Sequence, residues 1–188
     1  MAGSHNTPPA MVPNRAIFLS EDLKRNVKFL GIDTFLFTPS NFFSSDVHKV
    51  TMQLNRFLCL VVNRPEIPEK TKWRFVDECF KFFWTDKANR NSDNEFVVST
   101  GKVLETICDR VGWDVGKDLM DQVATEGKAV LMANTKTALD LHAFGSPILH
   151  FPGREDGIFF GSDRFEQIAF LLRLEWVGPR GPRNVSKL

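Results

Sequence analysis

No tyrosine occurs anywhere in this 188-residue chain, and cysteine and histidine are scarce. Cys59, Cys79 and Cys108 lie far apart, are odd in number and form no Cys-x-x-Cys pair, which argues against dithiol redox chemistry. Each lies in an apolar helical stretch, so the sequence predicts buried, reduced thiols. The four histidines show no metal-ligand spacing, so no metal site is expected.

The chain also lacks an excess of charge of either sign and any long apolar run. It carries 24 basic and 23 acidic residues, which gives no electrostatic case for binding nucleic acid. No segment reaches the length of a membrane span, and the N-terminus has no basic region followed by an apolar run. We therefore expect neither a membrane span nor a signal peptide. Eighteen phenylalanines and four tryptophans predict an interior or interface rich in large rings.

The pattern of apolar residues and helix breakers is mostly helical. The expected elements, in order, are a proline-rich loop over 1–15, helices over 20–30, 46–63 and about 69–84, two or three helices within 99–142, a β-hairpin over 147–160 and a helix over 163–174. These elements divide the chain into the loop 1–15, a helical domain 16–142, a hairpin-and-helix domain 143–176 and a tail 177–188.

The hairpin and the helix start that follows it form a candidate ligand site. Ser146-Pro147 precedes the first apolar strand, and the second strand turns at Gly161 into Ser162 and Asp163. The backbone before a proline can pair with an extended ligand, and free N–H groups at a helix start favour a carboxylate. Asp163 can accept a hydrogen bond from an ammonium group. The pattern therefore favours a small peptide-like ligand.

The same residues also have purely structural interpretations. Asp163 with Glu166 three residues later is an ordinary capping box. Gly161 is a usual residue before a helix, and Pro147 suits the start of an edge strand. The spacing alone leaves both interpretations open.

Four segments resemble a known family. "AFGSPILHF" (143–151) and "GIFFGSDRFEQIAFLL" (157–172) resemble the closing segment of kappa-class glutathione transferases, which are relatives of the disulfide oxidoreductase DsbA and of hydroxychromene-carboxylate isomerases. "LEWVGPRGPRNVSKL" (174–188) is similar to the family's tail, and "GSHNTPPAMVPNRAIFLSEDLKR" (3–25) is similar to its stretch from the sheet into the helical domain. The resemblance implies an α/β fold, in which a mostly helical domain is inserted into a thioredoxin-like, DsbA-like domain represented here by the C-terminal hairpin and helix.

The resemblance also bears on catalysis. In this family a strand, a helix and a strand precede the segment that here begins at Met1, and they carry the active-site serine in a Ser-Pro-Tyr-like turn. This chain has no such turn, because Ser146-Pro147 belongs to the hairpin. No residue is therefore assigned as catalytic, and an incomplete thioredoxin-like domain with impaired activity is expected. An unpaired hairpin edge recruits partners, so we also expect a homodimer.

Six residues match the family's glutathione contacts. Asn6 matches a loop asparagine whose amide pairs with a backbone or carboxylate group. Arg15 stands where the family commonly has a lysine that faces the glycyl carboxylate, and its planar guanidinium changes that geometry. Ser146 and Pro147 match the X-Pro pair whose proline is cis and whose preceding backbone pairs with the cysteinyl part. Ser162 and Asp163 match the pair that holds the γ-glutamyl end.

The resemblance thus implies a kappa-type glutathione transferase that conjugates or isomerises a small electrophile, with glutathione as co-substrate and no metal. Two alternatives stay open. One is a non-catalytic glutathione-binding protein. The other is a DsbA-like isomerase or dehydratase of secondary metabolism.

The chain ends in Ser186-Lys187-Leu188, the tripeptide that the peroxisomal import receptor reads. It follows a stretch broken by glycine and proline at 178–182, which should leave the tripeptide exposed. The sequence therefore predicts a peroxisomal protein with the import receptor as a partner.

Deleting Leu188 tests this expectation. A fluorescent protein fused to the N-terminus of the intact chain should collect in peroxisomes, and the deletion should leave it in the cytosol. Fluorescence microscopy with a peroxisomal marker distinguishes the two. If the deletion variant still reaches peroxisomes, the tripeptide is not the signal.

Overall fold

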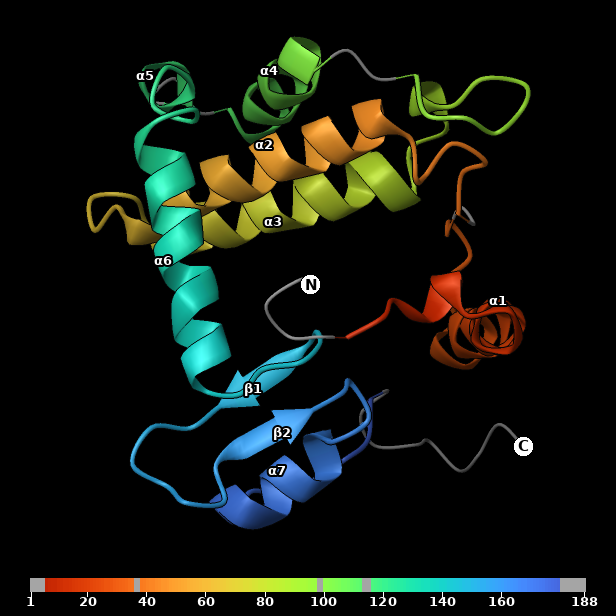
Figure 1. The fold of residues 1–188 in the computed structure, drawn as a ribbon, viewed down its shortest axis with the longest axis vertical. Helices are drawn as coiled ribbons and strands as arrows, with labels where there is room; N and C mark the ends of the chain where they lie inside the picture. Colours follow the sequence, from red (N-terminus) through yellow and green to blue (C-terminus); the bar gives the residue numbers. More distant parts are fainter. Residues whose placement is uncertain (1–5, 36–37, 98–99, 113–115, 180–188) are drawn as a thin grey trace. The chain divides into compact units, whose positions relative to one another are not determined.

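The computed structural model describes residues 6–35, 38–97, 100–112 and 116–179. They belong to two compact units, one made of residues 1–33 and 137–188 and the other of residues 34–136. The elements shown in Figure 1 are, in order, the 3-10 helix η2 (Pro9–Met11), α1 (Pro13–Leu30), α2 (Ser45–Asn63), α3 (Glu69–Trp84), the 3-10 helix η3 (Lys87–Asn89), α4 (Thr100–Val111), α5 (Gly116–Met120), α6 (Glu126–Asp140), β1 (Ile148–His150), β2 (Ile158–Phe160) and α7 (Phe165–Leu172).

The described chain is mostly helical with one small antiparallel sheet, which agrees with the predicted fold class. The two compact units have other bounds than the expected domains at both ends of the helical part. That part runs over 34–136, where 16–142 was expected, because α1 and residues 137–142 are grouped with the hairpin and α7. None of the described helices is long and apolar enough to cross a membrane.

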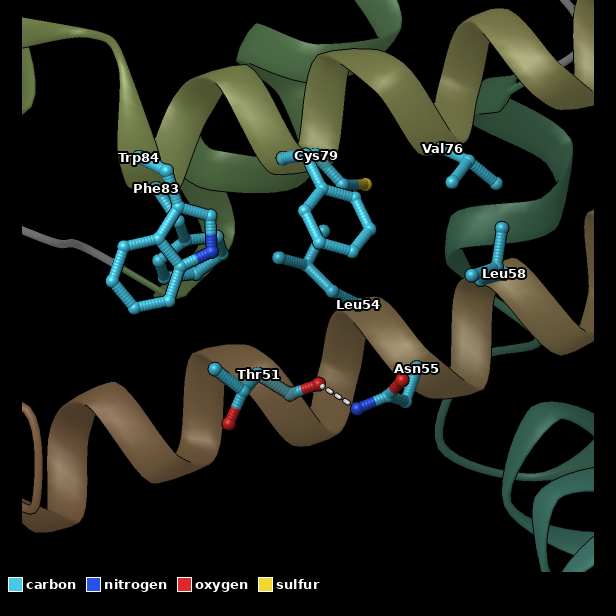
Figure 2. Close-up of a pocket in the computed structure, with 9 residues that line it drawn as sticks. Thr51, Leu54, Asn55, Leu58, Val76, Cys79, Phe83 and Trp84 are labelled. Carbon is cyan, nitrogen blue, oxygen red and sulfur yellow. Dashed lines mark hydrogen bonds between the residues drawn. The ribbon is translucent and has the colours of Figure 1, made fainter. Parts of the chain in front are cut away.

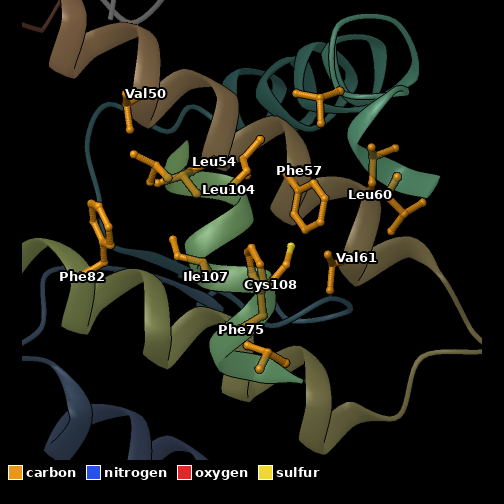
Figure 3. Packing of buried hydrophobic residues seen from close by; sticks show 14 of the residues in the cluster. Val50, Leu54, Phe57, Leu60, Val61, Phe75, Phe82, Leu104, Ile107 and Cys108 are labelled. Atoms are coloured by element: carbon orange, nitrogen blue, oxygen red, sulfur yellow. The ribbon is translucent and has the colours of Figure 1, made fainter. Parts of the chain in front are cut away.

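The unit over 34–136 is built on the packing of α2, α3 and α4. The apolar residues of α2 recur every three or four positions, so they form one face of the helix. They are Val47, Val50, Leu54, Phe57, Leu60 and Val61, all buried. Phe57 meets Phe75 of α3 at a ring-centroid distance of 5.0 Å, and Ile107 and Cys108 of α4 lie in the same cluster, as Figure 3 shows.

The C-terminal end of α3 is held by polar groups from the segment that follows it. Asn89 Nδ2 donates to the Phe82 carbonyl at 3.1 Å, and Arg90 Nη2 donates to the Phe83 carbonyl at 2.8 Å. These bonds satisfy two of the carbonyls that a helix end leaves without an intrahelical donor. The Arg90 guanidinium also lies 3.9 Å from the centre of the Phe96 ring, whose edge packs on Phe83. The last turn of α3 is therefore held both by hydrogen bonds from Asn89 and Arg90 and by packing of the Phe96 ring.

In the other unit, β1 and β2 form an antiparallel hairpin. Ile148 pairs with Phe160, Leu149 with Phe159 and His150 with Ile158. The loop closes where the Phe151 amide donates to the Gly157 carbonyl at 2.8 Å. A Cβ at Gly157 would lie 2.6 Å from the Phe151 carbonyl oxygen, so this closure requires glycine.

Two predicted helix starts are wrong. Helix α1 begins at Pro13 and not near Ser20, because proline is well suited to the first helical position. The expected loop 1–15 thus contains η2 and the start of α1. Helix α7 begins at Phe165, with Arg164 as its N-cap and no side-chain cap bond, so the Asp163–Glu166 capping box does not form.

The hairpin unit leaves many apolar side chains exposed. Helix α1 has no buried residue, and α7 buries only Ile168 and Ala169. Phe170 of α7 is 86% exposed. Within the described residues the sheet has only two strands, so each strand has one edge without a partner. Such edges and apolar faces favour association with a partner.

Replacing Phe75 by alanine should reduce the free energy of unfolding by about 3–5 kcal/mol, because the ring is fully buried and its removal leaves a cavity. Urea unfolding followed by circular dichroism measures the change. Trp73→Ala is the matched control on the same helix, since Trp73 is 65% exposed, and it should change stability by no more than about 0.5 kcal/mol. Equal losses for the two variants would contradict the core assignment.

Candidate functional site

The candidate site lies where the start of β1 meets the end of β2. The Gly161 amide donates to the Pro147 carbonyl at 3.1 Å, which continues the hairpin pairing by one bond. This bond places Ser146-Pro147 next to the turn that carries Ser162 and Asp163. The Ser146–Pro147 peptide bond is cis, as the family resemblance implied.

Asn6 is tied to the loop in front of this junction. Its Nδ2 donates to the Phe144 carbonyl at 2.6 Å, across 138 residues of sequence. The Phe144 ring packs on the Phe160 ring at a centroid distance of 4.6 Å. A Cβ at Gly145 would lie 2.7 Å from that Phe160 ring, so glycine leaves room for the packing. Asn6 therefore positions the loop that leads into Ser146.

Asp163 presents its carboxylate beside the turn glycine. Gly161 has a φ of +106°, and a Cβ there would lie 2.5 Å from Asp163 Oδ1. The Asp163 side chain is 71% exposed and forms an ion pair with Arg164 at 3.5 Å. Because the carboxylate does not cap α7, it remains available to an ammonium group. Ser162 is exposed, and no hydrogen bond of its side chain occurs within the described part of the chain.

Arg15 has no interaction with the other five predicted residues in the described part of the chain. It is exposed in the first turn of α1, and among the described residues its guanidinium makes no hydrogen bond or ion pair. The structure thus brings Ser146 and Pro147 near the turn with Ser162 and Asp163 through the Gly161–Pro147 bond, and it ties Asn6 to Phe144, two residues before Ser146. Among the residues it describes, it shows no bond between Arg15 and these positions. Their role in binding glutathione stays a prediction.

Sequence reasoning assigned the amide of Asn6 a possible partner in the backbone but did not find that partner. It also missed Phe144, Gly145 and Phe160, whose packing shapes the approach to Ser146. The only local signal was a Phe-Gly pair directly before Ser-Pro. That pair does not reveal which distant residue it meets.

The cysteines do not supply a nucleophile to this site. All three are free thiols. Burial raises the pKa of the Cys79 thiol to about 12 and that of Cys108 to about 11, and it also raises the pKa of Cys59. A thiol with a raised pKa is protonated at neutral pH and reacts slowly. No group of three or more metal-ligating side chains occurs in the described ranges.

Comparison with known families shows what class of protein carries this site. The model of the DSBA-like thioredoxin domain matches residues 1–173. The chain therefore belongs to the DSBA-like thioredoxin domain family.

Three curated relatives identify the branch of the family. The chain is similar to glutathione S-transferase kappa 1 of Rattus norvegicus and of Homo sapiens, at 28% and 29% identity over 194 residues, which is all of this chain and 79% of each relative. It is 31% identical to glutathione S-transferase kappa 1 of Caenorhabditis elegans over 180 residues, which is 92% of this chain and 72% of the relative. These matches confirm the resemblance to kappa-class transferases.

Asn6→Ala should loosen the loop before Ser146, because the Phe144 carbonyl loses its donor. We expect the free energy of unfolding to fall by about 0.5–1.5 kcal/mol, the usual net value of one hydrogen bond. Amide exchange of residues 143–146, followed by mass spectrometry, should accelerate at the same time. Asn14→Ala, on the exposed surface of α1, is the control and should leave that exchange unchanged. Unchanged exchange in Asn6→Ala would show that the bond does not hold the loop.

Proposed function

We propose that this chain is a glutathione transferase of the kappa type that acts on a small electrophile with glutathione as co-substrate. The observation that carries the proposal is the junction of Ser146-Pro147 with Ser162 and Asp163, found in a chain that aligns over its length with kappa-type relatives. Those relatives are glutathione S-transferases, which supports glutathione as the co-substrate.

The junction suits the γ-glutamyl and cysteinyl parts of glutathione. The open Asp163 carboxylate accepts from the γ-glutamyl ammonium group, and the Ser162 hydroxyl donates to the neighbouring carboxylate. The first amides of α7 have no intrahelical acceptor and favour that same carboxylate. The backbone before Pro147 pairs with the cysteinyl unit as an added strand would. Arg15 is assigned to the glycyl carboxylate, and Asn6 acts as a positioning residue.

The proposed reaction begins with the glutathione thiol losing its proton to solvent, because the thiolate is the nucleophile. The sulfur then forms a bond to an electrophilic carbon, and the leaving group departs with its electron pair. In an addition or isomerisation the electron pair moves instead onto an acceptor atom of the substrate. The described residues of this site bind and orient glutathione for that step, and we assign the thiolate donor to none of them.

We also propose that the chain acts as a homodimer in the peroxisome. The support for a dimer is the unpaired hairpin edge and the exposed apolar side chains of α1 and α7. The support for the peroxisome is the terminal tripeptide alone, and residues 186–188 lie outside the described part of the chain.

Asp163→Ala should weaken glutathione binding by about 1.5–3 kcal/mol, the scale of a hydrogen bond to a charged group, which corresponds to roughly a 10- to 150-fold rise in Kd. Titration calorimetry with glutathione measures this. Glu155→Ala is a matched control, because Glu155 is an exposed acid in the hairpin loop, and it should bind as the wild type does. Equal affinity of Asp163→Ala and wild type would remove Asp163 from the site.

A conjugation assay with a generic aromatic electrophile separates the enzyme from a protein that only binds glutathione. The proposal expects a rate above that of glutathione alone, reduced in Asp163→Ala at subsaturating glutathione. Binding without any acceleration would support the non-catalytic alternative and overturn the proposed activity.

A further inference from the structure

The helical unit contains a pocket of about 160 Å³ between α2 and α3. Figure 2 shows that its walls come from facing sides of the two helices. The apolar part of the lining consists of Leu54 and Leu58 from α2 and of Val76, Phe80, Phe83 and Trp84 from α3. All lining residues lie within residues 34–136, so the pocket belongs to one unit.

The spacing of the lining residues explains why a hollow forms here. On α2 the residues recur at 51, 54, 55 and 58, and on α3 at 76, 79, 80 and 83, so each set forms one stripe along its helix. Thr51, Val76 and Cys79 are the smaller side chains of the lining. Because the core residues fix the spacing of the two helices, these helices do not close over the smaller side chains.

The end of the pocket at Trp84 is supported by contacts with other rings. The Trp84 ring stacks on the Phe35 ring at a centroid distance of 5.7 Å and an interplanar angle of 8°, and it also packs on Phe42 at 5.8 Å. Phe83 is held edge-on by the Phe96 ring at 4.9 Å. A wall that is ordered in advance lowers the entropy cost of binding.

The polar groups of the pocket define the chemistry of its occupant. The Thr51 hydroxyl donates to the His48 carbonyl at 3.0 Å, and Figure 2 shows it on the side of α2 that faces away from α3. Asn55 Nδ2 donates to the Thr51 carbonyl at 2.9 Å, the bond drawn in Figure 2, which leaves the amide oxygen as an acceptor. The lining contains no Asp, Glu, Lys, Arg or His side chain, and burial holds the Cys79 thiol in its neutral form by raising its pKa to about 12.

The volume restricts the occupant further. A dry apolar cavity of roughly 150 Å³ accommodates a benzene molecule, whereas sites for drug-sized ligands occupy about 300–1,000 Å³. A pocket of about 160 Å³ therefore fits one aromatic ring and is too small to enclose glutathione.

We propose that the pocket between α2 and α3 binds an uncharged single-ring aromatic molecule with one hydrogen-bond donor, of the phenol class. The ring lies among Leu54, Val76 and Phe83, and the hydroxyl group donates to the Asn55 amide oxygen. This site does not depend on the proposed glutathione site, which is built from residues of the other unit.

Titration calorimetry of the full chain with phenol tests the proposal, with toluene and benzoate as matched ligands. The wild type should bind phenol saturably with a Kd on the order of 1 mM or below, a value within reach of a ligand of seven non-hydrogen atoms. Toluene lacks the donor and benzoate carries a charge, so each should bind at least about 10-fold more weakly. Comparable binding of benzoate and phenol, or no saturable binding of phenol, overturns the proposal.

Two variants locate the binding within the pocket. Cys79→Leu adds apolar volume and should abolish phenol binding, while an unchanged circular dichroism spectrum and a cooperative melting transition verify that it folds. Asn55→Ala, at an exposed position, should weaken phenol about 10-fold and leave toluene unaffected. Trp73→Ala, exposed on α3 and outside the lining, is the control and should bind as the wild type does.

Wild-type affinity for phenol in a folded Cys79→Leu variant would place the binding elsewhere and contradict the proposal. Glutathione titrations of the same variants are expected to be unchanged.

Discussion

The helical unit depends on one buried cluster, in which Phe57 of α2 packs on Phe75 of α3 and to which Ile107 of α4 also belongs. These three side chains have no exposed surface, so the spacing of the three helices is set by how their volumes fit. The spacing has a second consequence away from the centre. Where the stripes of α2 and α3 carry smaller side chains, the same spacing leaves the pocket beside Cys79. The core and the cavity thus have one physical cause.

The candidate glutathione site depends on a different constraint, because it is built on a hairpin of two short strands. A two-stranded hairpin is marginal by itself in water. The described structure adds two ties, the bond from Gly161 to Pro147 and the long-range bond from Asn6 to Phe144. The first continues the sheet by one pair, and the second fixes the loop before it. Both ties lie within residues 1–173, which the model of the DSBA-like thioredoxin domain matches.

Several elements follow directly from local patterns. The apolar period of 46–63 predicts a helix that the structure places at Ser45–Asn63, with the Ser44 hydroxyl accepting from the Val47 amide at its start. The two apolar runs separated by a turn with Gly153 and Gly157 predict the hairpin. The starts of α1 and α7 were predicted wrongly because each region offers more than one place for a helix to begin. In α1 the helix begins at Pro13, with Val12 as N-cap, and not near Ser20; in α7 the N-cap is Arg164 and not Asp163.

The sequence by itself determined the helical periodicity, the hairpin and the family, since each is encoded in short motifs of neighbouring residues. That six positions contact glutathione stays a prediction. Tertiary structure alone decided that the Asn6 amide reaches Phe144, that the Asp163 carboxylate is left free of a cap, and that α2 and α3 enclose a pocket. The physical reason is the same for all three. A hydrogen bond across 138 residues, the choice between competing caps and the space between two helices each depend on how separate segments pack, and no local pattern specifies that packing.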